Sequence, residues 1–414
     1  MRSARRLVIC AALATAVVSS AVVAAVTAQT AHTATADTPT FTLAVPLPLT
    51  DFGAYTLASL LHFDTAYGIN LKILPSTGGN TANLVASGQA DAASFTAATA
   101  IAISQQGKQT STIWLNEYQP GIALVGAPDI KTMADLKAAH NCRLAGPPAG
   151  SSTYLAALVY MRENSLKNCT LVQTPSQAAQ VQGTVAGAYQ ATVLGFSGAA
   201  QVVGAGGNWL IDPRTAAFAK TYGRSTFPSG IVFGLKSQLQ SKPAAVVGFL
   251  RAVIAADNYI NTHGNATVIA LLQKDAAFAT QSTSALELGY FVRPWLGVNA
   301  RRGTDTAGEV TPLRWKQALT AASHFGIATF DPTVPQAQYS AAVDMSYYKT
   351  AFPHIAQTDA KYNTLAKLAQ KYLGSASKWQ TLYTTAKPWI ATLNIPASRI
   401  PNTRFQSGTF FWWK

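Results

Sequence analysis

The sequence predicts an α/β protein with more than one domain, on the basis of its composition and of two successive runs of strands and helices. The chain has 414 residues, of which 49% are hydrophobic and 12% are charged. This length suits two or three domains. The composition excludes a disordered chain, which would be less hydrophobic and more charged. With 3 Cys, 29 Gly and 20 Pro, the chain is neither a disulfide scaffold nor collagen-like.

The first run of elements begins after residue 40. Alternating or continuous apolar stretches predict strands, and stretches with apolar residues three and four apart that end at glycine predict helices. The expected order is strand, helix, strand, helix, strand, strand, at 41–47, 53–67, 69–75, 81–87, 91–95 and 111–115. This order is typical of a parallel sheet covered by helices.

The second run follows the same rhythm. Thr132 and Asp135 have the spacing of a capping box, and Thr174 with Pro175 is predicted to begin another helix. Strands are expected at 121–126, 142–146, 169–173 and 187–193, with a helix at 151–164. A return strand at 230–236 then leads to helices at 243–262, 312–325 and 336–351. The sequence therefore predicts two α/β units that the chain crosses between twice.

Residues 1–36 form a predicted secretory signal peptide and linker. MRSARR is basic, an apolar run extends from Leu7 to Val26, and small residues offer cleavage sites after Ala28 and Ala36. The run is also long enough to stay in the membrane as an anchor, so cleavage and anchoring both remain open. In either case the rest of the chain is expected to be exported. Removal of the three arginines in this segment lowers the formal net charge from +14 to +11.

Two cysteines beyond this segment occupy matching positions. Cys142 and Cys169 each begin an apolar run, with a helical pattern between them. Neighbouring parallel strands lie about 4.8 Å apart, which would bring the two residues within reach of a disulfide. Export favours oxidation, so we predict this disulfide; the alternative is two buried free thiols. Two Cys and 6 scattered His have no metal-ligand spacing, and neither a metal nor a cofactor is expected.

Five loops follow predicted strands at their carboxyl ends, where α/β sheets bind ligands. They are rich in Ser, Thr, Gly and Asn, which offer hydroxyl and backbone N–H donors. GPPAGSST opens a helix and so favours an anion. The alternative is ordinary helix capping by Ser151 or Ser152. The loops are 48–53, 75–80, 94–99, 146–153 and 190–197.

Several stretches of residues 38–355 occur in a colinear order that is typical of one family. They are LPLTDFGAYTLASL, GINLKILPSTGGNTANLVASGQADAASFT, IKTMADLKAAHNCRLAGPPAGSSTYL and KPAAVVGFLRAVIAADNYINTHG. In these the chain resembles type 2 periplasmic substrate-binding proteins of ABC transporters, of the sulfonate, nitrate, taurine and thiamine-precursor group. The resemblance implies a two-lobed fold with a double crossover, in which 37–121 and 236–355 form lobe 1 and 122–235 form lobe 2. It also implies capture of a small solute between the lobes, without chemistry.

The resemblance assigns the solute contacts residue by residue. No Arg or Lys occurs in the assigned loops, which favours a sulfonate-like monoanion or a neutral pyrimidine-like heterocycle over phosphate. Asp51 either meets an amine on the solute or caps a helix, and Tyr118 either walls the cleft or belongs to the core. The implied contacts are Thr50, Asp51, Phe52, Ser76, Gly79, Asn80, Thr96 and Tyr118 in lobe 1, and Ser151, Ser152, Thr153 and Gln190 or Thr192 in lobe 2.

The composition changes after His354. Residues 356–414 hold eight Lys or Arg, one acidic residue and four of the 8 Trp. The stretch YNTLAKLAQKYLGSASKWQTLYTTAKPWI, followed by SRIPNTRF, resembles a LysM glycan-binding module with a strand at Ile400–Phe405. This implies a small α+β module over 356–414, with glycan-binding residues Asn363, Thr364, Gly374, Trp379 and Tyr383. A basic, aromatic surface also suits anionic cell-wall polymers; the alternative is a helical appendage packed on lobe 1.

Together these observations predict an extracytoplasmic solute-binding protein. It would act as a monomer, deliver its solute to an ABC permease and be tethered to the cell wall by its tail. The alternative is a wall-binding or adhesion protein that uses the α/β part as a scaffold. An enzyme is not predicted, because neither G-x-S-x-G nor H-E-x-x-H occurs. The predicted export counts against nucleic acid as a partner, despite a pI of 9.7.

Overall fold

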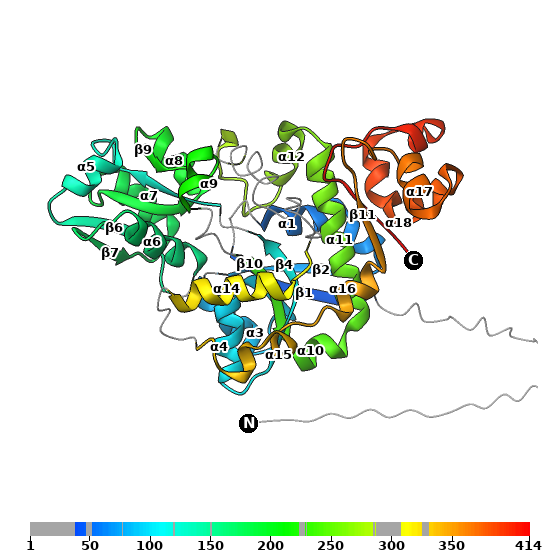
Figure 1. The fold of residues 1–414 in the computed structure, drawn as a ribbon, viewed down its shortest axis with the longest axis horizontal. Coiled ribbons are helices and arrows are strands. Elements are labelled where there is room, and N and C mark those ends of the chain that lie inside the picture. The colour runs from blue at the N-terminus through cyan, green and yellow to red at the C-terminus, as the bar shows by residue number, and fades with distance from the viewer. Residues whose placement is uncertain are drawn as a thin grey trace, which may run out of the picture. The chain divides into compact units, whose positions relative to one another are not determined.

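A computed structural model describes residues 38–46, 52–76, 78–118, 121–149, 151–222, 228, 230–284, 286, 308–324 and 331–414. The predicted signal segment and two predicted solute contacts, Thr50 and Asp51, lie outside these residues. The chain divides into two units, Met1–Asp37 and Thr38–Lys414. The second unit holds all the described elements (Figure 1).

Five strands form the first sheet, in the order β2-β1-β3-β10-β4. β1 (Thr40–Pro46) pairs in parallel with β2 (Asn70–Ser76) and with β3 (Ala92–Phe95). β10 (Gly230–Leu235) lies antiparallel between β3 and β4 (Thr110–Glu117). The strands at 41–47, 69–75, 91–95, 111–115 and 230–236 are therefore confirmed within a residue or two at each end.

Helices cover both faces of this sheet. α1 (Gly53–Leu60) and α11 (Pro243–Thr262) bury one face, where the Phe249 ring stacks on Phe41 at 4.8 Å. α3 (Gly78–Ala86) and α4 (Ala97–Gln105) bury the other. α11 is the one described helix that is long and apolar enough to span a membrane, but 78% of that stretch is buried within the protein. It is thus the central core helix of this unit.

The second sheet repeats the first, with the order β7-β6-β8-β5-β9. β6 (Cys142–Gly146) pairs in parallel with β7 (Cys169–Gln173) and β8 (Ala191–Gly195). β5 (Ile122–Gly126) lies antiparallel between β8 and β9 (Asn208–Ile211). The sequence reading missed β9. In both sheets the fourth position belongs to the strand that the chain forms directly after crossing from the other sheet.

This topology confirms the double crossover and corrects one boundary. The chain leaves the first sheet after β4, builds the second sheet and returns as β10. The prediction that residues up to 235 belong to lobe 2 is wrong, because β10 is hydrogen-bonded to β3 and β4 of the first sheet. The second lobe therefore ends before Gly230.

Helices also cover the second sheet: α5 (Met133–Ala138), α6 (Ser152–Glu163), α7 (Gln177–Val185), α8 (Phe196–Gly204) and α9 (Ala216–Tyr222). The capping box of Thr132 and Asp135 at α5 is confirmed. The predicted cap of α7 is wrong: Ser176 accepts from the Ala179 N–H, not Thr174. Thr174 instead donates its N–H and hydroxyl to Gly146 O, because it continues the pairing of β7 with β6.

Two predicted helices are interrupted. The helix expected at 53–67 splits at His62, which adopts φ 57°, into α1 and α2 (Phe63–Ala66). The helix expected at 336–351 splits into α15 (Tyr339–Ala342) and α16 (Ser346–Ala351). The chain leaves the helical path there because the Asp344 N–H donates to Thr112 O on the edge of β4. α10 (Lys236–Ser241), α12 (Asn265–Leu272) and α14 (Pro312–His324) complete the helices around the first sheet.

The last sixty residues form a strand–helix–helix–strand arrangement. β11 (His354–Gln357) pairs antiparallel with β12 (Phe410–Trp413), and α17 (Leu365–Leu373) and α18 (Trp379–Ile390) lie between them in the chain. The strand predicted at Ile400–Phe405 is wrong: a 3-10 helix spans Ala397–Asn402, and Pro401 within it lacks the N–H that a strand ladder needs. Figure 1 shows this tail against α11, and its side chains belong to the core cluster of the first sheet.

Candidate functional site

The candidate site lies at the carboxyl edges of the two sheets. β1, β2, β3 and β4 end at this edge of the first sheet, and β6, β7, β8 and β9 end at the corresponding edge of the second. β5 and β10 run in the opposite direction, so they begin there. The chain therefore makes both of its crossings at these edges, between Tyr118 and Ile122 and before Gly230.

Helices that begin at these edges differ in how they are capped, as α1, α4, α6 and α8 show. Thr96 caps α4 by accepting from the Thr99 N–H, and Ser151 caps α6 by accepting from the Tyr154 N–H. α1 and α8 have no side-chain cap. Each sheet thus supplies a helix N-terminus, that of α1 or of α8, without a side-chain cap. The partial positive charge of these N-termini is left for another group to satisfy.

Two predicted hydroxyl contacts of lobe 1 already have partners. Ser76, at the end of β2, is buried, and its Oγ lies 2.8 Å from Thr81 Oγ1. Thr96 Oγ1 lies 3.0 Å from Thr99 Oγ1 in addition to its capping bond. These hydroxyls lie at the predicted edge of the sheet, and they also hold α3 and α4 in place.

The other described contacts of lobe 1 take different positions. Gly79 and Asn80 both lie on the first turn of α3, and Asn80 is exposed. Phe52 is buried at the start of α1. Tyr118 is also buried, and the Arg314 guanidinium lies over its ring at 5.3 Å. Tyr118 therefore belongs to the core, and the Arg314 guanidinium that lies over its ring is a cation close to the crossover.

In lobe 2, Ser151 and Ser152 of the predicted GSS loop lie at the N-terminus of α6. Ser151 accepts at the N-terminus of α6 and donates its hydroxyl to Pro148 O at 3.3 Å. Ser152 and Thr153 are half-buried in the first turn of this helix. The capping interpretation of Ser151 is thus confirmed, and the N-terminus of α6 lies at the carboxyl edge of β6.

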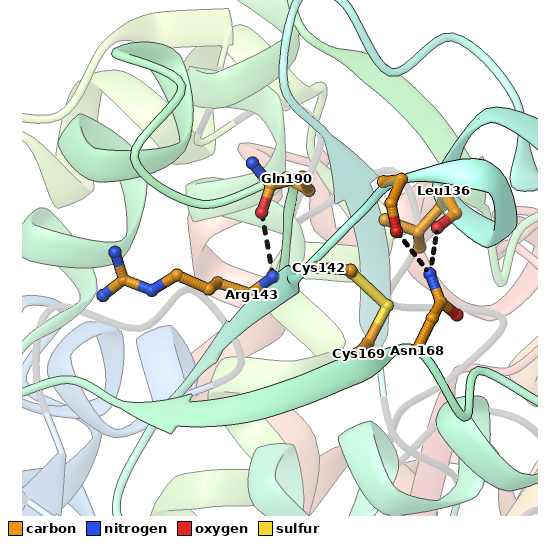
Figure 2. Close-up of a disulfide and its surroundings, with 7 residues drawn as sticks. Leu136, Cys142, Arg143, Asn168, Cys169 and Gln190 are labelled. Carbon is orange, nitrogen blue, oxygen red and sulfur yellow. Dashed lines mark hydrogen bonds between the residues drawn. A yellow bond between two sulfur atoms is a disulfide. The ribbon is translucent and has the colours of Figure 1, made fainter.

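Gln190 and Thr192 do not lie at the predicted edge. The pairing of β6 with β8 places Gln190 beside Arg143, at the amino end of both strands and near the disulfide (Figure 2). Gln190 Oε1 accepts from the Arg143 N–H at 2.8 Å. Thr192 is fully buried and donates to Ala145 O. The prediction is wrong because β8 begins at Ala191, so Gly195 and the N-terminus of α8 occupy the carboxyl edge instead.

The predicted disulfide between Cys142 and Cys169 is present. The two residues are direct partners in the pairing of β6 with β7, with their Cα atoms 4.2 Å apart. Asn168 reinforces this end of the sheet, because its Nδ2 donates to Leu136 O and Ala139 O (Figure 2). The disulfide therefore holds the amino ends of the strands, on the side of the sheet away from the candidate site.

A buried polar cluster at the carboxyl edge of the first sheet was missed by the sequence reading. Tyr55, on the first turn of α1, donates its hydroxyl to Asn116 Oδ1 at 2.8 Å and lies 3.1 Å from Ser94 Oγ. Asn116 Nδ2 is buried and has no hydrogen-bond partner in the described part of the chain. These residues lie inside strands and a helix, and no spacing in the sequence links them.

An arginine at the edge of the second sheet was missed as well. Arg214 follows β9 and forms a bidentate pair with Asp212, whose carboxylate it contacts at 2.6 Å. Its guanidinium lies 4.6 Å from the Trp209 ring and 5.9 Å from the Phe196 ring at the start of α8. Recognition of β9 as a strand would have drawn attention to this residue. The carboxyl edges thus carry cations that their loops did not suggest.

The five predicted glycan contacts of the tail fall into two groups. Thr364 caps α17 through the Lys367 N–H, with Asn363 beside it. Gly374 ends the same helix at φ 75°, and the Trp379 and Tyr383 rings lie 5.7 Å apart beyond it. α17 separates the groups by about 14 Å, at 1.5 Å per residue. The structure does not bring all five residues into one cluster.

One buried hydroxyl supports the crossover. Tyr160, on α6, donates to Ile122 O at the beginning of β5. Burial raises the pKa of Tyr160 far above its ordinary value, and the nearby Tyr222 adds to this rise. The Tyr160 hydroxyl is thus neutral and fixes α6 to the point where the second sheet begins.

The described residues contain no cluster of three or more His, Cys, Asp or Glu that would hold a metal ion.

Solved structures with the same fold come from several transport systems. The ligand-binding component of an ABC-type import system from Staphylococcus aureus, solved with zinc bound, has 14% identity and a TM-score of 0.58, over 76% of this chain and 99% of its own. The periplasmic nitrate-binding protein NrtA from Synechocystis PCC 6803 has 14% identity and a TM-score of 0.59, over 76% and 88%. The periplasmic aliphatic sulphonate-binding protein SsuA from Escherichia coli has 15% identity and a TM-score of 0.53, over 69% and 86%.

These likenesses confirm the expected periplasmic-binding-protein fold, and their low identities leave the solute open. No curated protein shows a significant sequence match to the chain. Residues 49–266 do match a family that is described as NMT1/THI5 like. This match covers more than half of the chain and includes both crossovers and most of both sheets. The protein belongs to the NMT1/THI5-like family.

Proposed function

We propose that the protein is an extracytoplasmic solute-binding protein that captures a small organic solute between its two lobes, without catalysis, and delivers it to an ABC permease. The observation that carries this proposal is the repeated sheet order, in which both crossovers lie at the carboxyl edges. Loops, helix N-termini and the connections between the lobes then share one region, which suits closure of two lobes around a ligand.

The chemistry of these edges favours a solute that accepts hydrogen bonds. α1 and α8 present N-termini without side-chain caps, one from each sheet, and such termini attract anions and other acceptors. Arg214 is paired with Asp212, so its charge is largely compensated. A sulfonate-like monoanion or a pyrimidine-like heterocycle fits this balance better than a doubly charged phosphate.

Among the residues assigned by resemblance, we retain those at the carboxyl edges. Asn80, Ser152 and Thr153 lie on first turns of helices and are at least partly exposed. Thr96, which caps α4, and Ser151, which caps α6, are retained with them. Thr50 and Asp51, which precede α1, complete the proposed set. Delivery to a permease is supported by the S. aureus neighbour, which is named as a component of an ABC-type import system.

The tail is proposed to hold the exported protein at the cell wall. Its one acidic residue, Asp359, accepts from the Lys361 and Tyr362 N–H groups. Lys361 and Lys371 lie over the Tyr362 ring at 5.1 and 4.3 Å, and Lys371 also lies 4.8 Å from the Tyr372 ring. This basic, aromatic surface suits an anionic wall polymer. It also supports the second candidate function, a wall-binding protein that uses the α/β part as a scaffold.

A thermal-shift series on the exported form of the chain tests the proposal. The compounds are ethanesulfonate, taurine, nitrate, cytosine and soluble peptidoglycan fragments, with sodium chloride as an ionic-strength control. A ligand at 100 times its dissociation constant adds about 2.7 kcal/mol to the free energy of unfolding, which raises Tm by several degrees. A rise with one small solute supports capture. A rise with peptidoglycan fragments alone favours the scaffold function.

A further inference from the structure

Asn116 lies in an irregular part of β4. Gly230 pairs with Glu117 and Ile231 pairs with Leu115, so the register between β10 and β4 shifts by one residue and leaves Asn116 without a partner in β10. Such bulges turn a side chain out of the regular alternation of a strand and are frequent beside functional sites. This one lies at the carboxyl end of β4, directly before the crossover.

The Asn116 side chain is fixed but only half satisfied. Asn116 is 3% exposed, and its Oδ1 accepts from the Tyr55 hydroxyl, which is itself beside Ser94 Oγ. Asn116 Nδ2 has no hydrogen-bond partner in the described part of the chain. A buried amide that is left unpaired is costly, and native proteins retain very few such groups without a reason.

The free side of this amide faces the other crossover. A Cβ placed on Gly230 would lie 3.3 Å from Asn116 Nδ2. Gly230 begins β10, where the chain returns from the second sheet. The unpaired N–H group therefore lies beside the first residue of β10. A methyl group at Gly230 would therefore crowd Nδ2, with Glu117 Oε2 3.5 Å from the same Cβ position.

We infer that Asn116 is a specificity-determining residue that donates through Nδ2 to a hydrogen-bond acceptor of the solute, either an oxygen of an oxyanion or a ring nitrogen. This inference rests on the proposed function and adds to it a named contact outside the loops. The uncapped N-terminus of α1 begins two residues before Tyr55, so an acceptor held there lies near both the helix dipole and the amide. A solute that offers only donors leaves Nδ2 unpaired and is selected against.

Binding titrations on three variants test this inference. Ethanesulfonate provides the oxyanion, cytosine provides the ring nitrogen, and ethylammonium provides donors alone. Asn116→Ala is expected to raise the dissociation constant of the favoured acceptor about tenfold, which corresponds to the loss of one hydrogen bond. Asn116→Asp is expected to raise this dissociation constant about a hundredfold, because a carboxylate oxygen, which accepts, replaces the amide N–H donor. Gly230→Ala places a methyl group beside Nδ2 and is expected to weaken binding as well.

Thr112→Val is the matched control. Thr112 Oγ1 is also buried without a partner and lies on the same strand, four residues before Asn116 and away from the carboxyl edge. Its removal is expected to leave the dissociation constant unchanged. The ligand-free Tm of Asn116→Ala should stay close to that of the wild type, because Tyr55 keeps its contact with Ser94.

The outcomes separate this inference from the proposed function. If the wild type binds an acceptor and both Asn116 variants bind it equally well, the inference is overturned and solute capture stands. The same conclusion follows if Thr112→Val loses as much affinity as Asn116→Ala. If the wild type binds neither acceptor, solute capture of this chemical class and the inference are both contradicted.

Discussion

Asn258 and Phe410 exchange two hydrogen bonds across 152 positions of sequence. Asn258 Nδ2 donates to Phe410 O, and the Phe410 N–H donates to Asn258 Oδ1, both at 2.8 Å. The amide of a core helix thereby acts as a strand partner for the first residue of β12. The tail is attached to lobe 1 by α11, and its aromatic residues continue the same core.

This attachment predicts that a tail substitution destabilises lobe 1. Trp412 is 1% exposed and its ring lies 6.0 Å from Tyr67 and 5.5 Å from Phe352. Trp412→Ala is expected to lower the free energy of unfolding by about 3–5 kcal/mol, as for a large buried aromatic residue. Denaturant unfolding measures the change. Trp379→Ala, in a half-buried position of the same tail, serves as the control with a loss of about 1 kcal/mol.

Calorimetry on the same pair distinguishes an integral tail from an independent module. A shared core predicts that Trp412→Ala shifts the transition of lobe 1 together with the tail. A separate low-temperature transition that leaves the main one unchanged would show that residues 356–414 fold by themselves.

The disulfide predicts a second stability change. Cys142→Ala with Cys169→Ala opens a loop of 27 residues and is expected to cost about 3–4 kcal/mol in the chain-entropy estimate. Reduction of the wild type should lower its Tm to that of the double variant. The same treatment should leave the Tm of the double variant unchanged. Solute affinity should be retained, because the disulfide lies at the amino ends of the strands. If the double variant is fully folded but no longer binds the solute, the assignment of the site to the opposite edge is contradicted.

A buried carboxylate predicts a third change. Asp91 is 3% exposed and accepts from the Thr42 N–H, Gln238 Nε2 and Lys242 Nζ at 2.8, 2.9 and 2.7 Å. Asp91→Ala leaves Gln238 Nε2 and Lys242 Nζ with only their longer contacts, to Gly88 O and Thr40 O at 3.4 Å, and is expected to cost about 2–3 kcal/mol, measured by urea unfolding. Asp212→Ala removes a more exposed carboxylate, since the Asp212 side chain is 16% exposed and that of Asp91 4%, and it should cost no more than about 1 kcal/mol. Equal losses in the two variants would contradict this ranking.

Tyr160 predicts how stability depends on pH. Burial raises the pKa of Tyr160 in the folded state, whereas an exposed tyrosine titrates near pH 10. The unfolded chain therefore loses this proton first as the pH rises. The contribution is complete below about pH 10 and falls above it, by about 1.4 kcal/mol per pH unit for this one group.

Tyr160→Phe removes this part of the alkaline loss. Tm measured from pH 8 to pH 11 should fall less steeply above pH 10 in the variant. The variant should also be less stable at pH 8, by about 1 kcal/mol, because the bond to Ile122 O is lost. Parallel curves for the two proteins above pH 10 would exclude this role of Tyr160.

The fold was predictable where local pattern and tertiary context agree. The strand at 142–146, the capping box at Thr132 and the helix at 243–262 match the structure, because apolar periodicity and capping chemistry are local. The disulfide followed from the same kind of argument, since two matching strand starts fix the register. The break at Val343–Asp344 was not predictable, because it depends on a hydrogen bond to the distant β4.

The site was less predictable for a similar reason. Loops such as GPPAGSST could be located from the strands before them. Gln190 was misplaced because a strand start that is wrong by a few residues moves a side chain from one end of the sheet to the other. Tyr55, Ser94 and Asn116 come together only through packing of α1 on β3 and β4, and no spacing in the sequence records that contact.

Hydrogen exchange with and without the solute that raises Tm most tests the central claim directly. Capture between the lobes predicts slower exchange in two separate regions, 52–56 with 92–97 and 114–118 in lobe 1, and 151–155 with 195–199 in lobe 2. The segment around the disulfide should exchange at the same rate in both states. Protection confined to 356–414, or to one lobe alone, would contradict capture of the solute between two lobes.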